Sequence, residues 1–188
     1  LVNRLLFDRK KIEARIQSLG KIAQLPDPVG QSTDVQLRPN GLRVSRVRVP
    51  LGVIMMIYEA RPHVTVNAGA FCLKSGNSAI LRGGSEVKEC NRVLGDLWRK
   101  AVTEAGLPPA CVQVVTGSHE EIAELLELDE FIDLVIPRGG KKLIHTVAEK
   151  SRIPVIKHFA GICHVYVDAE ADVDRALRIV IDSKCLMP

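Results

Sequence analysis

Aromatic residues and long apolar runs are scarce in this chain. Phenylalanine, tyrosine and tryptophan together make up 4% of the residues. No apolar run approaches the roughly 18 residues that a membrane-spanning helix needs. The first residues, LVNRLLFDRKKIEARIQ, lack the apolar core followed by small residues that is typical of a secretory signal. We therefore expect an intracellular, cytoplasmic protein with neither a membrane span nor a signal peptide.

Cysteine patterns that would hold a metal or a disulfide framework are also missing. The five cysteines form no CxxC pair and no Cys/His cluster with metal-ligand spacing. An odd number of scattered thiols fits a reducing compartment. The sequence thus predicts no metal site and no disulfide framework. The cysteines are Cys72, Cys90, Cys111, Cys163 and Cys185.

No block of like charge occurs either. The 26 basic and 22 acidic residues are spread along the chain and give a net charge of +4. With few aromatic side chains to stack on bases, the composition gives little support to a nucleic-acid partner. The small positive balance supports at most an anionic small ligand.

The residues that are present first predict a helix and a ribbon. Residues 1–30 form an N-terminal helical segment with Asp8 as a candidate N-cap. Residues 31–49 predict a β-hairpin that turns at Pro39-Asn40-Gly41, with a bulge near Ser45–Arg46 where the apolar alternation changes phase. The arginines of this hairpin leave two interpretations open. It is either an arm for an acidic partner or an exposed ribbon that needs another sheet or subunit.

From residue 50 the chain alternates between short apolar runs and helical segments. Short strands without apolar alternation, separated by helices, are typical of a parallel sheet that is buried on both faces. We therefore predict an α/β fold, a Rossmann-like and mostly parallel sheet, over residues 50–188. The predicted strands are 53–58, 78–81, 112–115, 134–136, 155–156 and 164–167, and the predicted helices are 63–74, 85–105, 120–126, 140–149 and 172–183.

Three turns after predicted strands are suited to a phosphate group. Ligands of open parallel sheets bind at the carboxyl ends of the strands, and a helix that begins there offers free N–H groups. Glycine in such a turn also has a purely conformational use, and neither GxGxxG nor a Walker A motif is present to name the ligand. The turns are Arg82-Gly83-Gly84-Ser85, Arg138-Gly139-Gly140 and the plainer one at Gly117.

Two further residues are candidates for chemistry. His158 follows a predicted strand and precedes Ala160-Gly161, where the backbone could approach a ligand. Cys185 lies near the end of the last predicted helix, where the helix dipole would raise the pKa of a thiol rather than lower it. We interpret Cys185 as structural and keep His158 as a catalytic candidate.

Several long motifs carry a family resemblance over essentially the whole chain. They are PLGVIMMIYEARPHVTVNAGAFCLKSGNSAILRGGSE, AGLP, DLVIPRGGKKLI and HFAGICHVYVDAEADVDRAL. In this order they resemble the gamma-glutamyl phosphate reductases of the aldehyde dehydrogenase superfamily. The resemblance implies NADPH-dependent reduction of L-glutamyl 5-phosphate to L-glutamate 5-semialdehyde, with release of phosphate, in proline biosynthesis. The family mechanism uses a cysteine thiolate that becomes a thioester, which hydride then reduces.

The resemblance also assigns roles to residues. It places Arg82, Gly83, Gly84 and Ser85 near the adenosine ribose and phosphate of the cofactor, Gly117 on the adenine side, and Arg138, Gly139 and Gly140 against the pyrophosphate. It makes the 35–49 ribbon an oligomerisation hairpin that joins identical subunits. His158 takes the place where hydrolytic relatives carry a water-activating glutamate, and His63 replaces the asparagine of the family motif RPNVT.

The nucleophilic cysteine of the family would follow Pro188. The resemblance therefore implies an N-terminal fragment in which residues 50–188 are an incomplete NAD(P)-binding domain and the catalytic domain is absent. A different class of protein is also open, a non-catalytic nucleotide-binding or oligomerisation module with the same fold. A cysteine followed by Asn-Ala or Gly-Ala in the coding sequence after Pro188 would favour the reductase.

Overall fold

The computed structural model describes residues 8–158 and 163–186. The chain divides into two compact units, Leu1–Lys157 and His158–Pro188, and each is described by itself. The boundaries expected from the sequence, 1–30, 31–49 and 50–188, stay predictions.

The order of the elements follows the predicted alternation. In the first unit the elements are α2 (Arg9–Ala23), β1 (Ser32–Leu37), β2 (Arg43–Val47), β3 (Val53–Tyr58), α3 (Pro62–Lys74), β4 (Ser78–Arg82), a 3-10 turn (Ser85–Val87), α4 (Lys88–Glu104), a 3-10 turn (Pro109–Cys111), β5 (Val112–Val114), α5 (His119–Leu125), β6 (Leu134–Arg138) and α6 (Lys141–Lys150). The second unit holds α7 (Val173–Ile181) and a π-helical turn (Asp182–Leu186).

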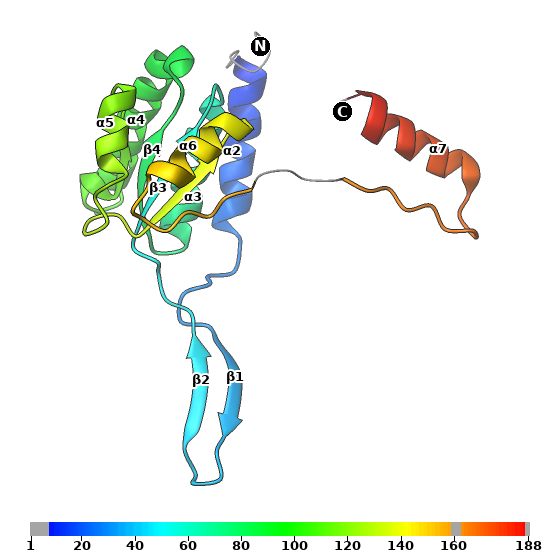
Figure 1. The fold of residues 1–188 in the computed structure, drawn as a ribbon, viewed down its shortest axis with the longest axis horizontal. Coiled ribbons are helices and arrows are strands. Elements are labelled where there is room, and N and C mark those ends of the chain that lie inside the picture. Colours follow the sequence, from blue (N-terminus) through cyan, green and yellow to red (C-terminus); the bar gives the residue numbers. More distant parts are fainter. Residues whose placement is uncertain (1–7, 159–162, 187–188) are drawn as a thin grey trace. The chain divides into compact units, whose positions relative to one another are not determined.

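The main sheet has four strands in the order β5-β4-β3-β6, and all of its pairings are parallel (Figure 1). Each strand therefore delivers its carboxyl end to the same edge of the sheet. Pro137 lies in β6, an outer strand of this sheet, where a missing N–H is tolerated. The predicted α/β class with a parallel, Rossmann-like sheet is confirmed.

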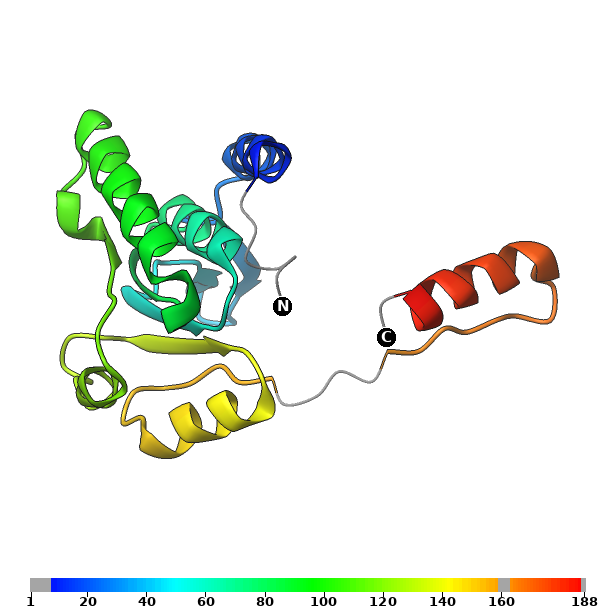
Figure 2. The same cartoon turned by 90° about the horizontal axis from the view of Figure 1, so that it is seen from above.

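Helices cover both faces of the sheet (Figure 2). Alternate residues of β3 point to opposite sides: Ile54 and Tyr58 join a core with α3 and α4, and Met55 and Ile57 join a core with α5 and α6. Apolar side chains are thus needed at every position of the strand, which explains why the sequence shows no alternation there.

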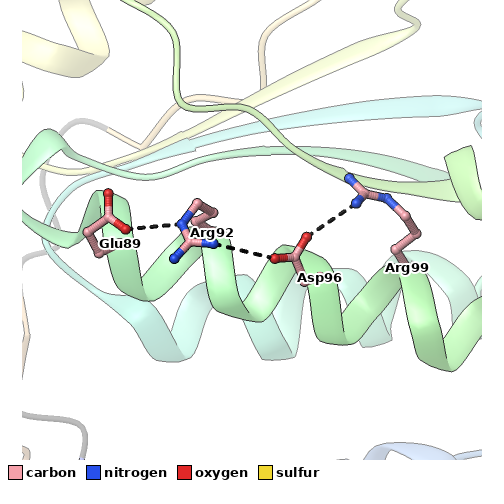
Figure 3. Close-up of polar contacts among 4 residues, drawn as sticks. All are labelled: Glu89, Arg92, Asp96 and Arg99. Carbon is pink, nitrogen blue, oxygen red and sulfur yellow. Dashed lines mark hydrogen bonds and ion pairs between the residues drawn. The ribbon is translucent and has the colours of Figure 1, made fainter.

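Helix α4 has a buried face and a charged face. On the buried face, the indole of Trp98 lies against α3 at Gly69, where a Cβ atom would stand 2.8 Å from the ring, so this close crossing requires glycine. On the solvent face, Glu89, Arg92, Asp96 and Arg99 form a ladder of ion pairs with N–O distances of 3.0, 3.7 and 3.2 Å (Figure 3).

Polar side chains close the amino-terminal edge of the sheet. The side-chain oxygen of Asn77 accepts hydrogen bonds from the N–H groups of Leu51 and Gly52, at 2.6 and 2.9 Å. The carboxylate of Asp133 accepts one from Val53 at 2.7 Å. These bonds fix the start of β3 against β4 and β6, so the opposite edge is the one left for a ligand.

The N-terminal part behaves as the sequence predicts, with one correction. Asp8 caps α2 by accepting a hydrogen bond from the N–H of Lys11, and β1 and β2 form an antiparallel ribbon that extends away from the sheet (Figure 1). The predicted bulge is in the wrong strand. Asp34 and Val35 of β1 together oppose Ser45 of β2, because Asp34 adopts a left-handed φ of 53°, which aspartate tolerates.

Two predicted strands are wrong. At 155–156 a single bridge joins Val155 to Val135, and Pro154, which has no N–H, cannot extend the ladder. The segment His164–Val167 is not a strand, because the described part of the second unit offers it no strand to pair with. A run with strand-like composition forms a strand only where a neighbour is available.

Candidate nucleotide-binding site

The turns that follow β4 and β5 meet at the carboxyl edge of the sheet and enclose a pocket of about 290 Å³. Five of the eight predicted cofactor residues line it: Arg82, Gly83, Gly84, Ser85 and Gly117. Thr116 and Ser118, which flank Gly117 in the third predicted turn, also line it, together with Lys88 and Asn91, which the sequence did not single out. The structure thus brings together the first and third predicted turns.

Arg82 is the charged centre of this region. Arg82 is only 8% exposed, and its Nε is buried without a hydrogen-bond partner among the described residues. Arg82 also lines a neighbouring pocket of about 490 Å³, together with Lys142 and the two carboxylates Glu59 and Glu86. A buried, unpaired guanidinium nitrogen is unfavourable unless an anion or other acceptor binds there.

The helix that follows Arg82 also leaves its amino terminus open. Neither the 3-10 turn that begins at Ser85 nor α4 has a side-chain cap. By contrast, α5 has a complete capping box, in which Ser118 accepts from the N–H of Glu121 and the Glu121 carboxylate accepts from the N–H of Ser118 at 2.6 Å. Of these two turns, only the Arg82 turn therefore keeps helix N–H groups uncapped by side chains for an anion.

Gly83 serves the chain's own packing. A Cβ atom at this position would collide with the amide Nδ2 of Asn91 and stand 3.0 Å from the ring of Tyr58. Gly83 is thus required by side-chain packing and not by a left-handed backbone. Any room for ligand backbone contact comes from the neighbouring Gly84, where the flexible side chain of Glu86 lies closest.

The turn Arg138-Gly139-Gly140 lies apart from this pocket lining. The N–H of Gly140, at the start of α6, donates a 2.8 Å hydrogen bond to the carboxylate of Glu59, and a Cβ on Gly139 would stand 2.6 Å from that carboxyl carbon. The predicted pyrophosphate position is thus held by an anion of the chain itself. Glu59 was missed because only the fold places the end of β3 beside α6.

Arg138 lines an apolar groove of about 530 Å³ on the α3 side of the sheet, together with His63 and Phe71. Burial, followed by the nearby cations Arg15, Arg61 and Lys11, lowers the pKa of His63. The neutral imidazole is therefore favoured, and this position offers no cation to a substrate carboxylate or phosphate near neutral pH.

A second group that the sequence reasoning missed is a buried polar chain under Gly83. The hydroxyls of Tyr58 and Thr65 lie 2.6 Å apart, and the Thr65 hydroxyl donates to Oδ1 of Asn91 at 2.7 Å. A signal was present, since Asn91 falls in the apolar stripe of α4 with Val87, Leu94 and Val102. A polar residue at a core position of a helix indicates a specific hydrogen-bonding role.

The second unit contains the remaining candidates. His158 is its first residue and is exposed, and the Ala160-Gly161 segment expected to approach a ligand lies outside the described residues. Cys185 is an exposed free thiol in the π-helical turn, where the neighbouring Lys184 ammonium donates to the carbonyl of Cys163. The catalytic role of His158 and the structural role of Cys185 stay predictions.

The described residues contain neither a metal-binding cluster nor a membrane-spanning helix. Within 8–158 and 163–186 there is no group of three or more His, Cys, Asp or Glu side chains arranged to hold a metal ion. No helix in the same ranges has the length and apolar character needed to cross a membrane.

A parallel sheet covered on both faces, with an open pocket at the carboxyl ends of its strands, defines a doubly wound α/β protein, a class that binds ligands at this edge. The family is also defined. Residues 5–187 match the model of the aldehyde dehydrogenase family, and the chain belongs to that family.

Curated relatives are identical to this chain at about half of the aligned positions. The gamma-glutamyl phosphate reductases of Persephonella marina and of Xanthomonas campestris pv. campestris strain B100 are each 50% identical to it over 189 residues and over 100% of the chain. The chain covers 42% and 46% of these relatives, so it spans less than half of their length.

Solved structures agree with the fold. The gamma-glutamyl phosphate reductase of Thermotoga maritima superposes with a TM-score of 0.87 at 39% identity, over 97% of this chain and 44% of its own. That of Saccharomyces cerevisiae gives 0.69 at 38% identity, over 95% and 46%. An acetylating aldehyde dehydrogenase from Geobacillus thermoglucosidasius, at 18% identity and a TM-score of 0.64 over 82% of this chain and 34% of its own, shares the fold.

Proposed function

We propose that this chain carries the cofactor-binding part of a reductase that converts L-glutamyl 5-phosphate to L-glutamate 5-semialdehyde, with release of phosphate, in proline biosynthesis. The support is the 50% identity to proteins named gamma-glutamyl phosphate reductase. The single structural observation that carries the proposal is the buried, unpaired Nε of Arg82 beside an uncapped helix start. Both features suit the phosphate of a dinucleotide.

The proposed cofactor is NADPH rather than NADH. NAD-binding α/β domains commonly place an aspartate or glutamate on the ribose 2′-hydroxyl, whereas an arginine accommodates a 2′-phosphate. The lining of the 290 Å³ pocket contains the cations Arg82 and Lys88, while the carboxylates of Glu86 and Glu121 lie beside its glycines Gly84 and Gly117. In this position Arg82 and Lys88 would bind the 2′-phosphate, and the hydroxyls of Ser85 and Thr116 would donate to it.

In the reaction the chain's part is to hold and orient the cofactor. NADPH supplies a hydride when bound. Arg82 and the helix start at Ser85 would anchor one end of the dinucleotide and so fix its direction. The backbone at Gly139 and Gly140 would bind a second phosphate only in competition with the carboxylate of Glu59, which accepts from the N–H of Gly140. We propose the thiol nucleophile at a cysteine other than Cys185, and we retain His158 as a candidate near the reacting group.

Two partners belong to this proposal. L-Glutamyl 5-phosphate is the substrate, consistent with the names of the relatives. The 35–49 ribbon joins identical subunits, since β1 and β2 are exposed throughout and carry the exposed apolar side chains Val35, Leu37, Val44 and Val47. An isolated two-stranded ribbon is marginal without such a neighbour. Five free thiols agree with the reducing cytoplasm that we propose as its location.

The test is a titration of the 188-residue chain with NADPH and with NADH, followed by nucleotide fluorescence. We expect NADPH to bind at least about tenfold more tightly, because a charged hydrogen bond is worth roughly 1.5–3 kcal/mol. Arg82→Met, which keeps an apolar stem in the buried site, should remove this preference. Arg99→Met, which deletes the same charge from the exposed ladder of α4, is the matched control and should leave the preference unchanged.

Turnover separates the reductase from a non-catalytic module. With glutamate 5-semialdehyde and phosphate as substrates, we expect negligible reduction of NADP⁺ by the 188-residue chain. We expect full turnover by a protein that matches the curated relatives over their whole length. Absence of NADPH binding by the chain would contradict the cofactor role. Binding without turnover in the longer protein would favour the module.

A further inference from the structure

Three buried polar side chains connect the end of β3 to the 290 Å³ pocket. Tyr58 lies at the end of β3, Thr65 in α3 and Asn91 in α4, and their exposed fractions are 0%, 0% and 1%. The hydroxyls of Tyr58 and Thr65 are 2.6 Å apart, and Thr65 Oγ1 is 2.7 Å from Asn91 Oδ1. Such a chain between three elements is costly to bury unless each group is satisfied.

The hydrogen bond from Thr65 to Asn91 sets the direction of this chain. Burial raises the pKa of Tyr58 to about 12, so its phenol is protonated and needs an acceptor, and Thr65 is the acceptor in reach. The Thr65 hydroxyl has one hydrogen, which it gives to Asn91. The order of donation is therefore Tyr58 to Thr65 to Asn91. Asn91 must turn its carbonyl oxygen towards Thr65 and its NH₂ group away.

That NH₂ group lies at the pocket. The Nδ2 of Asn91 is the atom with which a Cβ on Gly83 would collide, and Gly83 and Asn91 both line the cavity. No acceptor for Nδ2 occurs among the described residues. The other polar side chains in the lining are also donors or hydroxyls: Arg82, Ser85, Lys88, Thr116 and Ser118. These donors suit an oxyanion, and the carboxylates beside the lining are those of Glu86 at Gly84 and Glu121 at Gly117.

We infer that Asn91 donates through Nδ2 to a phosphate oxygen of the bound dinucleotide, and that Tyr58 and Thr65 are positioning residues that hold the amide in this orientation. This inference rests on the proposed function and adds a specificity-determining residue to it. The phosphate is either the 2′-phosphate or the pyrophosphate of the dinucleotide, two sources with the same chemistry.

The first experiment compares two variants at Thr65 in the 188-residue chain. Thr65→Val keeps the shape of the side chain and removes the hydroxyl, so the amide loses its orientation. We expect the Kd for NADPH to rise about tenfold, which corresponds to one hydrogen bond. Thr65→Ser restores the hydroxyl and should return the Kd to within about twofold of the parent chain. A merely structural role of Thr65 would not give this rescue.

The second experiment changes Asn91 itself. Asn91→Asp has the same shape but replaces the donor by an acceptor, so binding of a phosphate should fall by more than tenfold. Trp98→Phe is the control on the same helix, because it removes the 3.2 Å hydrogen bond to the Thr65 carbonyl without touching the pocket lining. A loss for NADPH alone assigns the 2′-phosphate, and an equal loss for NADPH and NADH assigns the pyrophosphate.

The outcomes distinguish a failure of the inference about Asn91 from a failure of the proposed function. If the parent chain binds NADPH and the Thr65→Val and Asn91→Asp variants bind it equally well, the inference about Asn91 is overturned and the proposed function stands. If Thr65→Ser is as weak as Thr65→Val, the positioning role is overturned. If the parent chain binds neither nucleotide, the proposed function fails and the inference fails with it.

Discussion

Single residues decide which of the three predicted phosphate turns is open. The turns at Ser85 and at Gly140 both lack a side-chain cap, but at Gly140 the carboxylate of Glu59 accepts from the N–H of the N-cap residue, and the turn at Ser118 has a complete capping box with Glu121. The sequences of the turns do not distinguish these cases. Glycine content alone therefore overstates the number of anion sites, since the residue that closes a helix start can come from a distant strand.

Glu59 gives the first prediction at this scale. Its carboxylate accepts a hydrogen bond from the N–H of Gly140 and would repel a phosphate that approaches α6. Glu59→Gln keeps the hydrogen-bond geometry and removes the charge. We expect the affinity for NADPH to rise about two- to fivefold, and the free energy of unfolding to fall by about 0.3–1 kcal/mol because a charge–dipole interaction is lost.

Nucleotide titration and urea unfolding measure these two opposite effects. Glu124→Gln is the matched control, because Glu124 is an exposed acid on α5 that lines neither pocket of the candidate site. It should change neither quantity appreciably. A fall in NADPH affinity for Glu59→Gln would show that Glu59 contacts the ligand favourably rather than competing with it.

At the scale of the element, the two faces of α4 differ in what they contribute. The ladder Glu89–Arg92–Asp96–Arg99 is exposed, with 56–77% of each side chain accessible. Exposed pairs are worth about 0.3–0.5 kcal/mol each and are screened by salt. We expect Asp96→Asn, which removes two pairs, to lower the free energy of unfolding by less than about 1 kcal/mol.

The buried face supplies the comparison. Leu94→Ala, on the same helix, should cost about 2–5 kcal/mol because it leaves a cavity in the core. Urea unfolding at low and at high salt distinguishes the two effects: the Asp96→Asn difference should shrink in salt and the Leu94→Ala difference should not. A larger, salt-independent effect at Asp96 would mean that the ladder is coupled to the packing of α4.

Elements are also where sequence reasoning succeeded best. The strands β3 and β4 and the helices α3, α4 and α6 were predicted to within a few residues, because apolar periodicity reports burial directly. The sequence could not show that 155–156 forms only a single bridge or that 164–167 is not a strand, since pairing depends on which strand lies alongside. The same limit hid Glu59 and the Tyr58–Thr65–Asn91 chain, whose members are close in space and not in sequence.

At the scale of the whole molecule, the core that supports the pocket couples stability to alkaline pH. Burial raises the pKa of Tyr58 to about 12 from 10.0 and that of Cys72 to about 11 from 9.0, and both side chains belong to the core under α3 and α4. In the unfolded chain both groups lose their protons at lower pH. The folded state therefore binds more protons above about pH 9, and its stability falls as the pH rises.

The loss should be complete near pH 12, once the folded-state pKa of Tyr58 is reached. Since one pH unit of displacement is worth about 1.4 kcal/mol, the two groups together remove several kcal/mol, a large part of the 5–15 kcal/mol typical of a domain. We expect the chain to unfold between about pH 9 and 12, as followed by circular dichroism. In Cys72→Ala we expect the midpoint of this transition to shift upward, once the stability that the cavity costs has been measured at neutral pH and subtracted.

Tyrosinate absorbance reports the same event from the other side. The chain has two tyrosines, so in a Tyr166→Phe background the whole signal belongs to Tyr58. We expect this signal to rise together with the loss of circular dichroism, because the phenol ionises only when the core opens. Cys185→Ala, an exposed thiol in the second unit, is the control and should leave the midpoint in place. Ionisation of Tyr58 while the helices remain intact would mean that solvent reaches the Tyr58–Thr65–Asn91 chain in the folded protein.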